Sequence, residues 1–228
     1  MNTEITVDEL MAVQEIAKRI PGWSDAKQFA FFRNVLGWPH EIKRILMLGV
    51  YQGRDISLIL AAAKRLCPDR PLEIVGVDKF EDTACADWPA HLRNTSWKMA
   101  GFGDAPTLDK ARLNIAETIG EVPGGTPERL TFTNGTTIEI VKAIDVEWLA
   151  ANDRKFDLVY LDTSHDFETV AHQLRLVRRS CALGALVCGD DYTDDHGWGV
   201  KRAVEAGLNR HQVFAGWIWW APLDALKS

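Results

Sequence analysis

RILMLGVYQGRDISLILAAAKRLCPDRPLEIVGVD, residues 44–78, contains in order a strand, a turn with two glycines, a helix and a second strand. The strands at 44–50 and 72–78 are apolar almost throughout, which is typical of parallel strands covered on both faces. Residues 55–66 have the apolar spacing of an amphipathic helix. This stretch therefore predicts a strand–helix–strand unit of a parallel α/β sheet with right-handed crossovers.

The rest of the chain continues the alternation of strand and helix patterns. After the first unit we expect strands at 129–134, 156–162 and 185–191, helices at 137–150, 167–179 and 199–208, and a final aromatic segment at 213–221. Helices at 7–20 and 24–36 precede the sheet and form an N-terminal helical cap within 1–40. The predicted fold is a doubly wound, mostly parallel α/β sheet in one domain spanning 1–228.

Composition and charge restrict the classes of partner. The 228 residues carry a formal net charge of −6, which repels phosphate backbones and anionic lipid, so a small molecule is favoured over nucleic acid or a membrane. The N-terminal residues lack the pattern of a secretion signal and no stretch has the length of a membrane span, so we expect a cytoplasmic protein. The four cysteines show no C-x-x-C spacing, and neither a disulfide nor a zinc site is expected.

Two features near the first unit point to a nucleoside ligand. Gly49 and Gly53 allow the backbone to turn sharply and leave room for a ligand beside a helix N-terminus, although a tight turn alone also needs glycine. The turn lacks the third glycine of a dinucleotide motif and the lysine of a P-loop. Asp78 ends the second strand, where a carboxylate can accept both ribose hydroxyls or can simply cap the next segment. Together they favour a nucleoside without a triphosphate.

Residues 44–207 resemble the class I S-adenosylmethionine-dependent methyltransferases. LGVYQG and the acid in VGVDKF match the cofactor motifs of that family. FDLVYLDTSHDFETVAHQL, followed by GALVCGDDYTDDHGWGVKRAVEA, resembles its small-molecule, metal-dependent O-methyltransferase branch, which includes macrocin and catechol methyltransferases. The resemblance implies that S-adenosylmethionine is bound by Gly49, Val50, Tyr51, Gly53, Asp78, Lys79 and Asp162, with adenine near Gly135, Thr136 and Thr137. Met47 stands where that family commonly has an acid that supports the methionine end.

Acidic residues follow two later strands. Asp162 follows one strand, and Asp190 and Asp191 follow the next, so adjacent strands would bring all three carboxylates to one edge of the sheet. Carboxylate oxygens suit Mg²⁺ or another octahedral cation, and the resemblance implies a metal at these positions. The alternative is that the later pair belongs to a solvated turn. Asp162 or His165 is the expected proton acceptor, although His165 could instead cap the helix beginning near Phe167.

Tryptophans mark the expected substrate pocket. The long connection 80–119, with Trp88, His91, Trp97, Met99 and Phe102, predicts a substrate lid. Trp23, Trp38 and Trp198 are further candidates for the pocket wall, or else pack a satellite core. The segment with Trp217, Trp219 and Trp220 predicts a buried or dimer-facing strand, so a homodimer is a further expectation.

The expected reaction is methyl transfer from S-adenosylmethionine to a hydroxyl of a small organic acceptor, with a divalent cation, most simply Mg²⁺. One alternative keeps the cofactor but methylates nitrogen or carbon without metal. Another is a binding protein with a degenerate methyltransferase fold, a reading that Met47 supports.

Overall fold

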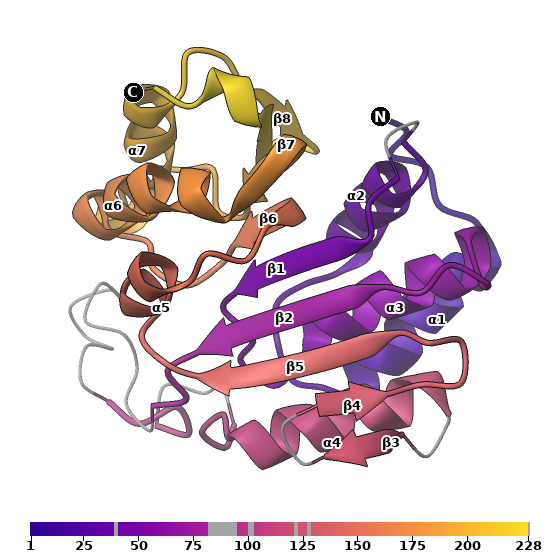
Figure 1. Ribbon diagram of the computed structural model, residues 1–228. Helices are drawn as coiled ribbons and strands as arrows, with labels where there is room; N and C mark the ends of the chain where they lie inside the picture. Colours follow the sequence, from indigo (N-terminus) through magenta and orange to yellow (C-terminus); the bar gives the residue numbers. More distant parts are fainter. Residues whose placement is uncertain (39–40, 82–94, 100–102, 121–122, 127–128, 228) are drawn as a thin grey trace.

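The computed structural model describes residues 1–38, 41–81, 95–99, 103–120, 123–126 and 129–227 (Figure 1). Within these residues nine strands form one sheet in the order β3-β4-β5-β2-β1-β6-β7-β9-β8. The strands are β1 Arg44–Leu48, β2 Glu73–Asp78, β3 Gly124–Thr126, β4 Arg129–Thr131, β5 Thr137–Lys142, β6 Phe156–Leu161, β7 Cys181–Gly189, β8 Gln212–Phe214 and β9 Ile218–Pro222. Strands β5, β2, β1, β6 and β7 are parallel, and the outer strands are antiparallel. The predicted mostly parallel α/β fold is confirmed.

Helices cover both faces of the sheet (Figure 1). They are α1 Val7–Arg19, α2 Ala26–Leu36, α3 Arg54–Leu66, α4 Leu108–Ile119, α5 Asp145–Ala151, α6 Phe167–Val177 and α7 Val200–Gly207. Alternate side chains of β1 explain the two layers. Ile45 and Met47 pack with helices α1 to α4, whereas Leu46 and Leu48 pack with α5 to α7. Each strand is therefore apolar on both faces, as the first motif predicts.

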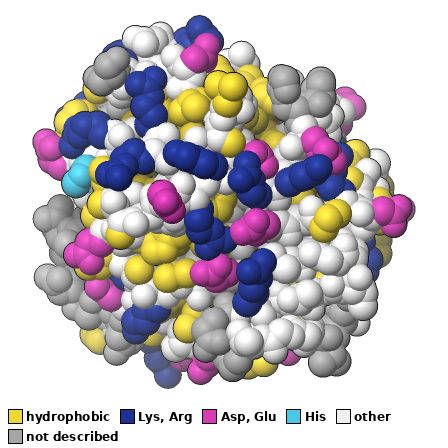
Figure 2. All heavy atoms as spheres, in the orientation of Figure 1, with side chains coloured by type: hydrophobic (Ala, Val, Ile, Leu, Met, Phe, Trp, Pro, Cys, Tyr) yellow, Lys and Arg dark blue, Asp and Glu magenta, His cyan; other side chains and the backbone are white. Residues whose placement is uncertain are grey.

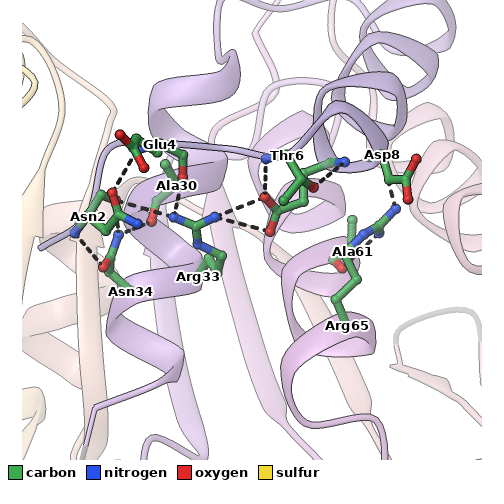
Figure 3. A network of polar contacts seen from close by, with 10 residues as sticks. Asn2, Glu4, Thr6, Asp8, Ala30, Arg33, Asn34, Ala61 and Arg65 are labelled. Carbon is green, nitrogen blue, oxygen red and sulfur yellow. Dashed lines mark hydrogen bonds and ion pairs between the residues drawn. The ribbon is translucent and has the colours of Figure 1, made fainter.

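The N-terminal helices are fixed by a capping box at the start of each and by an ion pair between them. Figure 3 shows Thr6 at the start of α1 and Arg33 of α2. Thr6 caps α1 together with Glu9, and Asp25 caps α2, one residue after the predicted Ser24. Arg33 of α2 donates to both carboxylate oxygens of Glu9, at 3.1 and 2.9 Å. Both bonds come from Nη1, and Nη2 donates to the backbone oxygen of Glu4 at 2.6 Å. Arg33 therefore joins α1 to α2 and also holds the N-terminal segment.

The predicted helix at 137–150 is wrong. Residues Thr137–Lys142 form strand β5, which pairs in parallel with β2, and only Asp145–Ala151 are helical. Alternation decides the strand, because Ile138 and Ile140 are buried while their neighbours are more accessible. This strand changes where ligand-binding residues are expected. Residues after 142 lie at the carboxyl end of the parallel strands, and residues before 137 lie at the opposite end.

The C-terminal aromatic segment forms the hairpin β8–β9, and its predicted burial is confirmed for Trp219, which is 1% exposed. Trp220 packs edge-on against Trp38, with ring centroids 5.1 Å apart, so Trp38 packs against the core and does not line the large cavity described below. A dimer contact by this segment stays a prediction. Among the described residues, no helix is both long and apolar enough to span a membrane.

Candidate functional site

A cavity of about 1000 Å³ opens at the carboxyl ends of the parallel strands. Its walls come from the loops after β1, β2, β5, β6 and β7 and from the start of α2. Ligand pockets typically measure roughly 300–1,000 Å³, so this one has room for two small molecules side by side. The charged side chains of its described lining are Asp25, Lys27, Arg54, Asp55, Asp78, Lys79, Glu81, Asp145, Asp162, Asp166, Asp190 and Asp191.

The glycine turn lies on one side of this cavity. Gly49 has φ +92°, and a Cβ there would lie 1.8 Å from the carbonyl oxygen of Asp162. Glycine is thus required because the ends of β1 and β6 approach closely. Gly53 has φ +89° and packs beneath α4, where a Cβ would lie 2.8 Å from Ile115. Gly49, Val50 and Tyr51 line the cavity, but Gly53 does not.

Asp78 holds the glycine turn in place. Its Oδ2 accepts hydrogen bonds from the backbone amides of Val50 and Tyr51, both at 2.8 Å, and its Oδ1 accepts one from Phe80 at 2.7 Å. The carboxylate also lines the cavity, as does the neighbouring Lys79, whose Nζ lies 2.9 Å from Glu81. An ionised carboxylate has about four acceptor positions, so Asp78 keeps capacity for a ligand hydroxyl.

The loop expected to contact adenine lies elsewhere. Thr136 Oγ1 accepts from the amide of Leu72 at 3.1 Å, at the amino end of β2, and Gly135 and Thr137 are likewise outside the cavity lining. The expectation for these three residues is therefore corrected. Ile144, Asp145 and Val146, which follow β5, line the cavity instead. They were missed because residues 137–150 were expected to be one helix.

Three predicted acids do meet at one edge of the sheet. Asp162 follows β6, Asp190 and Asp191 follow the adjacent β7, and all three line the cavity. Gln28 of α2 donates to Asp190 Oδ2 at 2.7 Å. The sequence pattern did not indicate a fourth acid, Asp55, which lines the same cavity and whose charge acts on Asp162. The expected cluster thus exists and is larger than predicted.

Proximity and burial change the acidity of this cluster. Burial, with the charges of Asp190, Asp55 and Asp191, raises the pKa of Asp162 well above its usual range. Burial and the charge of Asp191 raise the pKa of Asp190 to about 7, and burial raises the pKa of Asp55 to about 6. Asp162 and Asp55 line the cavity and are partly accessible there, yet burial is still the largest cause of their raised pKa values. The cluster therefore holds protons near neutral pH unless a cation compensates the charge.

His165 extends the cluster toward the tryptophans. Its Nε2 lies 2.8 Å from Asp191 Oδ2, and its ring stacks on Trp198 with centroids 4.2 Å apart. The alternative that His165 caps α6 is wrong, because the cap is Asp166, which accepts from the amide of Thr169 at 2.9 Å. A histidine oriented by a carboxylate is the arrangement of a general base.

No three His, Cys, Asp or Glu side chains of the described residues are arranged so that they could hold a metal ion. The donor chemistry nevertheless fits a hard cation. Asp162, Asp190 and Asp191 offer only oxygen ligands, and their mutual repulsion is of the kind that a divalent cation relieves.

Aromatic side chains form part of the cavity wall. Tyr51 packs against both Trp23 and Trp97, with ring centroids 5.4 and 4.9 Å away, and the two tryptophans are 6.5 Å from each other. Trp198 and Trp217 also line the cavity. Of the predicted lid, Trp97 thus contributes to the wall, but Leu108–Ile119 form helix α4 against α3 and are no lid. Trp88, His91 and Phe102 lie outside the described residues.

The raised carboxyl pKa values predict an unusual dependence of stability on pH. Between about pH 4 and pH 7 the folded protein keeps protons on Asp55 and Asp190 that the unfolded chain has released. The free energy of unfolding should therefore fall as pH rises through this window, by a few kcal/mol, which lowers Tm by several degrees. Thermal unfolding of metal-stripped protein at pH 5.5 and 8 measures this. Asp190→Asn should flatten the dependence, and a Tm that rises over this window would contradict the assignment.

The chain matches a family model and resembles several solved structures. A family model described as a methyltransferase domain matches residues 46–192, more than half of the chain. The O-methyltransferase from Bacillus cereus, solved with SAH, is 15% identical over 98% of this chain and 92% of its own, with a TM-score of 0.53. TomG from Streptomyces achromogenes, an O-methyltransferase solved with SAM, is 16% identical over 95% and 88%, with a TM-score of 0.51. The calicheamicin methyltransferase CalS11 is 17% identical over 96% and 94%, with a TM-score of 0.54. At such identities the likeness shows a shared fold, and no curated protein matches the sequence.

Proposed function

This chain belongs to the family of methyltransferase domains, and from that premise we propose that it transfers a methyl group from S-adenosylmethionine to a hydroxyl oxygen of a small organic acceptor. One observation carries the proposal. A single cavity joins the glycine turn and Asp78 on one side to the Asp162–Asp190–Asp191 cluster and His165 on the other. The first side suits a nucleoside cofactor, and the second suits an acceptor hydroxyl that must lose a proton.

The cofactor would lie along the carboxyl ends of β1, β2 and β5. The backbone at Gly49–Tyr51 would bind its methionine end, with Asp162 alongside, and Asp78 would accept the ribose hydroxyls. Adenine would lie near Ile144–Val146, which replace the loop expected from the sequence. Lys79 adjoins the ribose position, where its aliphatic stem can pack against the nucleoside.

Asp162, Asp190 and Asp191 would hold a divalent cation, most simply Mg²⁺, because they provide hard oxygen donors and unrelieved negative charge at one edge of the sheet. When bound, the cation would lower the pKa of the acceptor hydroxyl and orient it. Gln28 would orient Asp190, and His165 would orient Asp191, through the hydrogen bonds already present.

Side chains of the cavity then accept the proton of the acceptor hydroxyl. The other ring nitrogen of His165, Nδ1, or the Asp162 carboxylate would take it from the acceptor hydroxyl, because Nε2 already contacts Asp191 at 2.8 Å. S-adenosylmethionine, when bound, would supply the methyl group: the new O–C bond would form as the C–S bond breaks, with S-adenosylhomocysteine as the leaving group. Because the methyl group already carries sulfonium activation, positioning supplies most of the rate enhancement. Trp198 fixes the His165 ring for this purpose.

Methyl transfer from labelled S-adenosylmethionine to a panel of catechols and sugar alcohols tests this proposal. Metal-stripped protein should turn over slowly, and added Mg²⁺ should restore O-methyl products. Equal turnover without metal, or methylation at nitrogen or carbon, would contradict the oxygen and cation assignments. Binding of S-adenosylhomocysteine without any methyl transfer would favour a non-catalytic binding protein instead.

A further inference from the structure

The net negative charge of this chain is concentrated in the cavity. The sequence holds 32 Asp and Glu against 26 Lys and Arg. In the described part of the chain, nine of these carboxylates and three of these cations line the cavity. Elsewhere 23 residues of each sign remain, so the rest of the chain is electrically balanced. Figure 2 shows such a mixed surface, with Lys and Arg side chains interspersed with Asp and Glu on the face it presents.

Neutral groups hold most of the cavity carboxylates in place. Asp78 is held by backbone amides, Asp190 by the amide of Gln28, and Asp145 by Gln173 and by the hydroxyl of Thr163. These hydrogen bonds fix the carboxylates without pairing them with a cationic side chain. By contrast, Glu81 forms an ion pair with Lys79. The cavity therefore keeps a negative potential, which the surrounding low-dielectric protein focuses.

Cofactor and metal do not cancel this charge. S-adenosylmethionine carries a sulfonium, an ammonium and a carboxylate and so adds one positive charge, and a divalent cation adds two. With the cation bound, the acids of the Asp162 cluster lose their protons and the lining carries six negative charges in excess, of which about three remain uncompensated by the cofactor and the cation. Whatever occupies the acceptor side then meets an uncompensated negative field.

Aromatic faces complete the acceptor side. Trp198 stacks on His165 beside Asp191, and Trp217, at 37% exposure, lines the cavity next to the same strand end. The backbone oxygen of Trp217 accepts from Tyr192, one residue beyond Asp191. Negative potential combined with indole faces is the environment that binds organic cations, through the ring quadrupole.

We propose that the acceptor carries a protonated amine in addition to the hydroxyl that is methylated, and that the cavity rejects acceptors bearing a carboxylate or phosphate. This inference rests on the proposed function, and it narrows the acceptor to a hydroxylated organic cation. Rejection of anions supplies selectivity by repulsion, which no contact with the hydroxyl itself could provide.

Three matched catechols test the inference: dopamine, 4-methylcatechol and 3,4-dihydroxyphenylacetate, which differ mainly in the charge of the side chain. With S-adenosylmethionine and Mg²⁺ present, kcat/KM for the amine should exceed that for the carboxylate by on the order of 100-fold, with the neutral compound between them. Raising the salt concentration from 20 to 500 mM should shrink the ratio. Equal values for the three, or preference for the carboxylate, would overturn the inference while leaving methyl transfer intact.

Trp217 provides a variant outside the methyl-transfer chemistry. Trp217→Leu should reduce the preference for the amine over the neutral catechol by about three- to tenfold, whereas Trp217→Phe, which keeps an aromatic face, should retain most of it. Each variant's kcat/KM for dopamine is compared with its own kcat/KM for 4-methylcatechol, so that a general loss of acceptor binding does not affect the ratio. An unchanged preference in Trp217→Leu would remove the aromatic part of the inference.

Failure of the proposed function can be told apart from failure of this inference. If no catechol is methylated, the proposed function fails, but the cavity field is still measurable through its tryptophans. Caesium should then quench tryptophan fluorescence more efficiently than iodide, relative to free N-acetyltryptophanamide. Stronger quenching by iodide would overturn the inference independently of catalysis.

Discussion

An Asp162→Asn variant should transfer methyl groups roughly 1000-fold more slowly than the native protein, yet it should unfold at a higher temperature at pH 8. The rate falls because the carboxylate that receives the proton, or holds the cation, is gone, and such roles contribute about 10² to 10⁴. Stability rises because the neutral amide avoids the cost of burying a charge and the repulsion by Asp190, Asp55 and Asp191. Initial rates and thermal unfolding, measured on the same preparation, check both effects.

Asp166→Asn is the matched control for this variant. Asp166 lies in the same loop and caps α6, and asparagine caps a helix about as well as aspartate. Its activity and Tm should stay near those of the native protein. An Asp162→Asn variant that is fully active would contradict the role of Asp162, and one that is both inactive and less stable would indicate a structural role.

A Gly49→Ala variant should lose about 3 kcal/mol or more of folding free energy and all measurable binding of S-adenosylhomocysteine. Its Cβ would fall 1.8 Å from the carbonyl oxygen of Asp162, so the ends of β1 and β6 would have to separate. That separation displaces the glycine turn and the acid cluster together. Urea denaturation and calorimetric titration measure the two losses.

Gly120→Ala separates steric conflict from backbone strain. Gly120 also has a positive φ, +69°, but no atom lies within 4 Å of a Cβ built there. The substitution should cost only about 1 kcal/mol and leave ligand binding unchanged. Equal stability of the two variants would show that the close approach at Gly49 does not matter.

The acids at the site were predictable because position in a parallel sheet determines where strand ends meet. Asp162, Asp190 and Asp191 directly follow strongly apolar strands, and adjacency of β6 and β7 brings them together. The Gly49 turn and Asp78 follow from the same rule for β1 and β2. The local sequence was sufficient to predict these residues, because each directly follows a parallel strand and the topology brings the ends of those strands together.

Strand β5 was missed because its sequence fits both the two-residue period of a strand and the roughly 3.6-residue period of a helix. Six residues of strand run into α5 through Ala143 and Ile144, without the glycine, proline or asparagine that commonly separates such elements. The expected position of adenine moved to the wrong end of the sheet as a result. Helix α4 was also missed, although Thr107 caps it and Ala111 and Ile115 have helical spacing.

Asp55 was missed for a different reason. An acid in the first turn of a helix is ordinarily explained by the helix dipole and by solvent. Its burial depends on the segment around Ser24, which packs across the turn from a distant part of the chain. Contacts of that kind, like the pairing of His165 with Asp191, are set by tertiary packing and leave no local pattern.

Calorimetric titration of the purified protein with S-adenosylhomocysteine, with Asp78→Asn as the comparison, shows whether the cavity binds the cofactor. We expect saturable binding at one site per chain, weakened at least about tenfold by Asp78→Asn, because a charge-assisted hydrogen bond to ribose is lost. Absence of binding to the native protein would contradict a methyltransferase role for the cavity and leave only the shared fold.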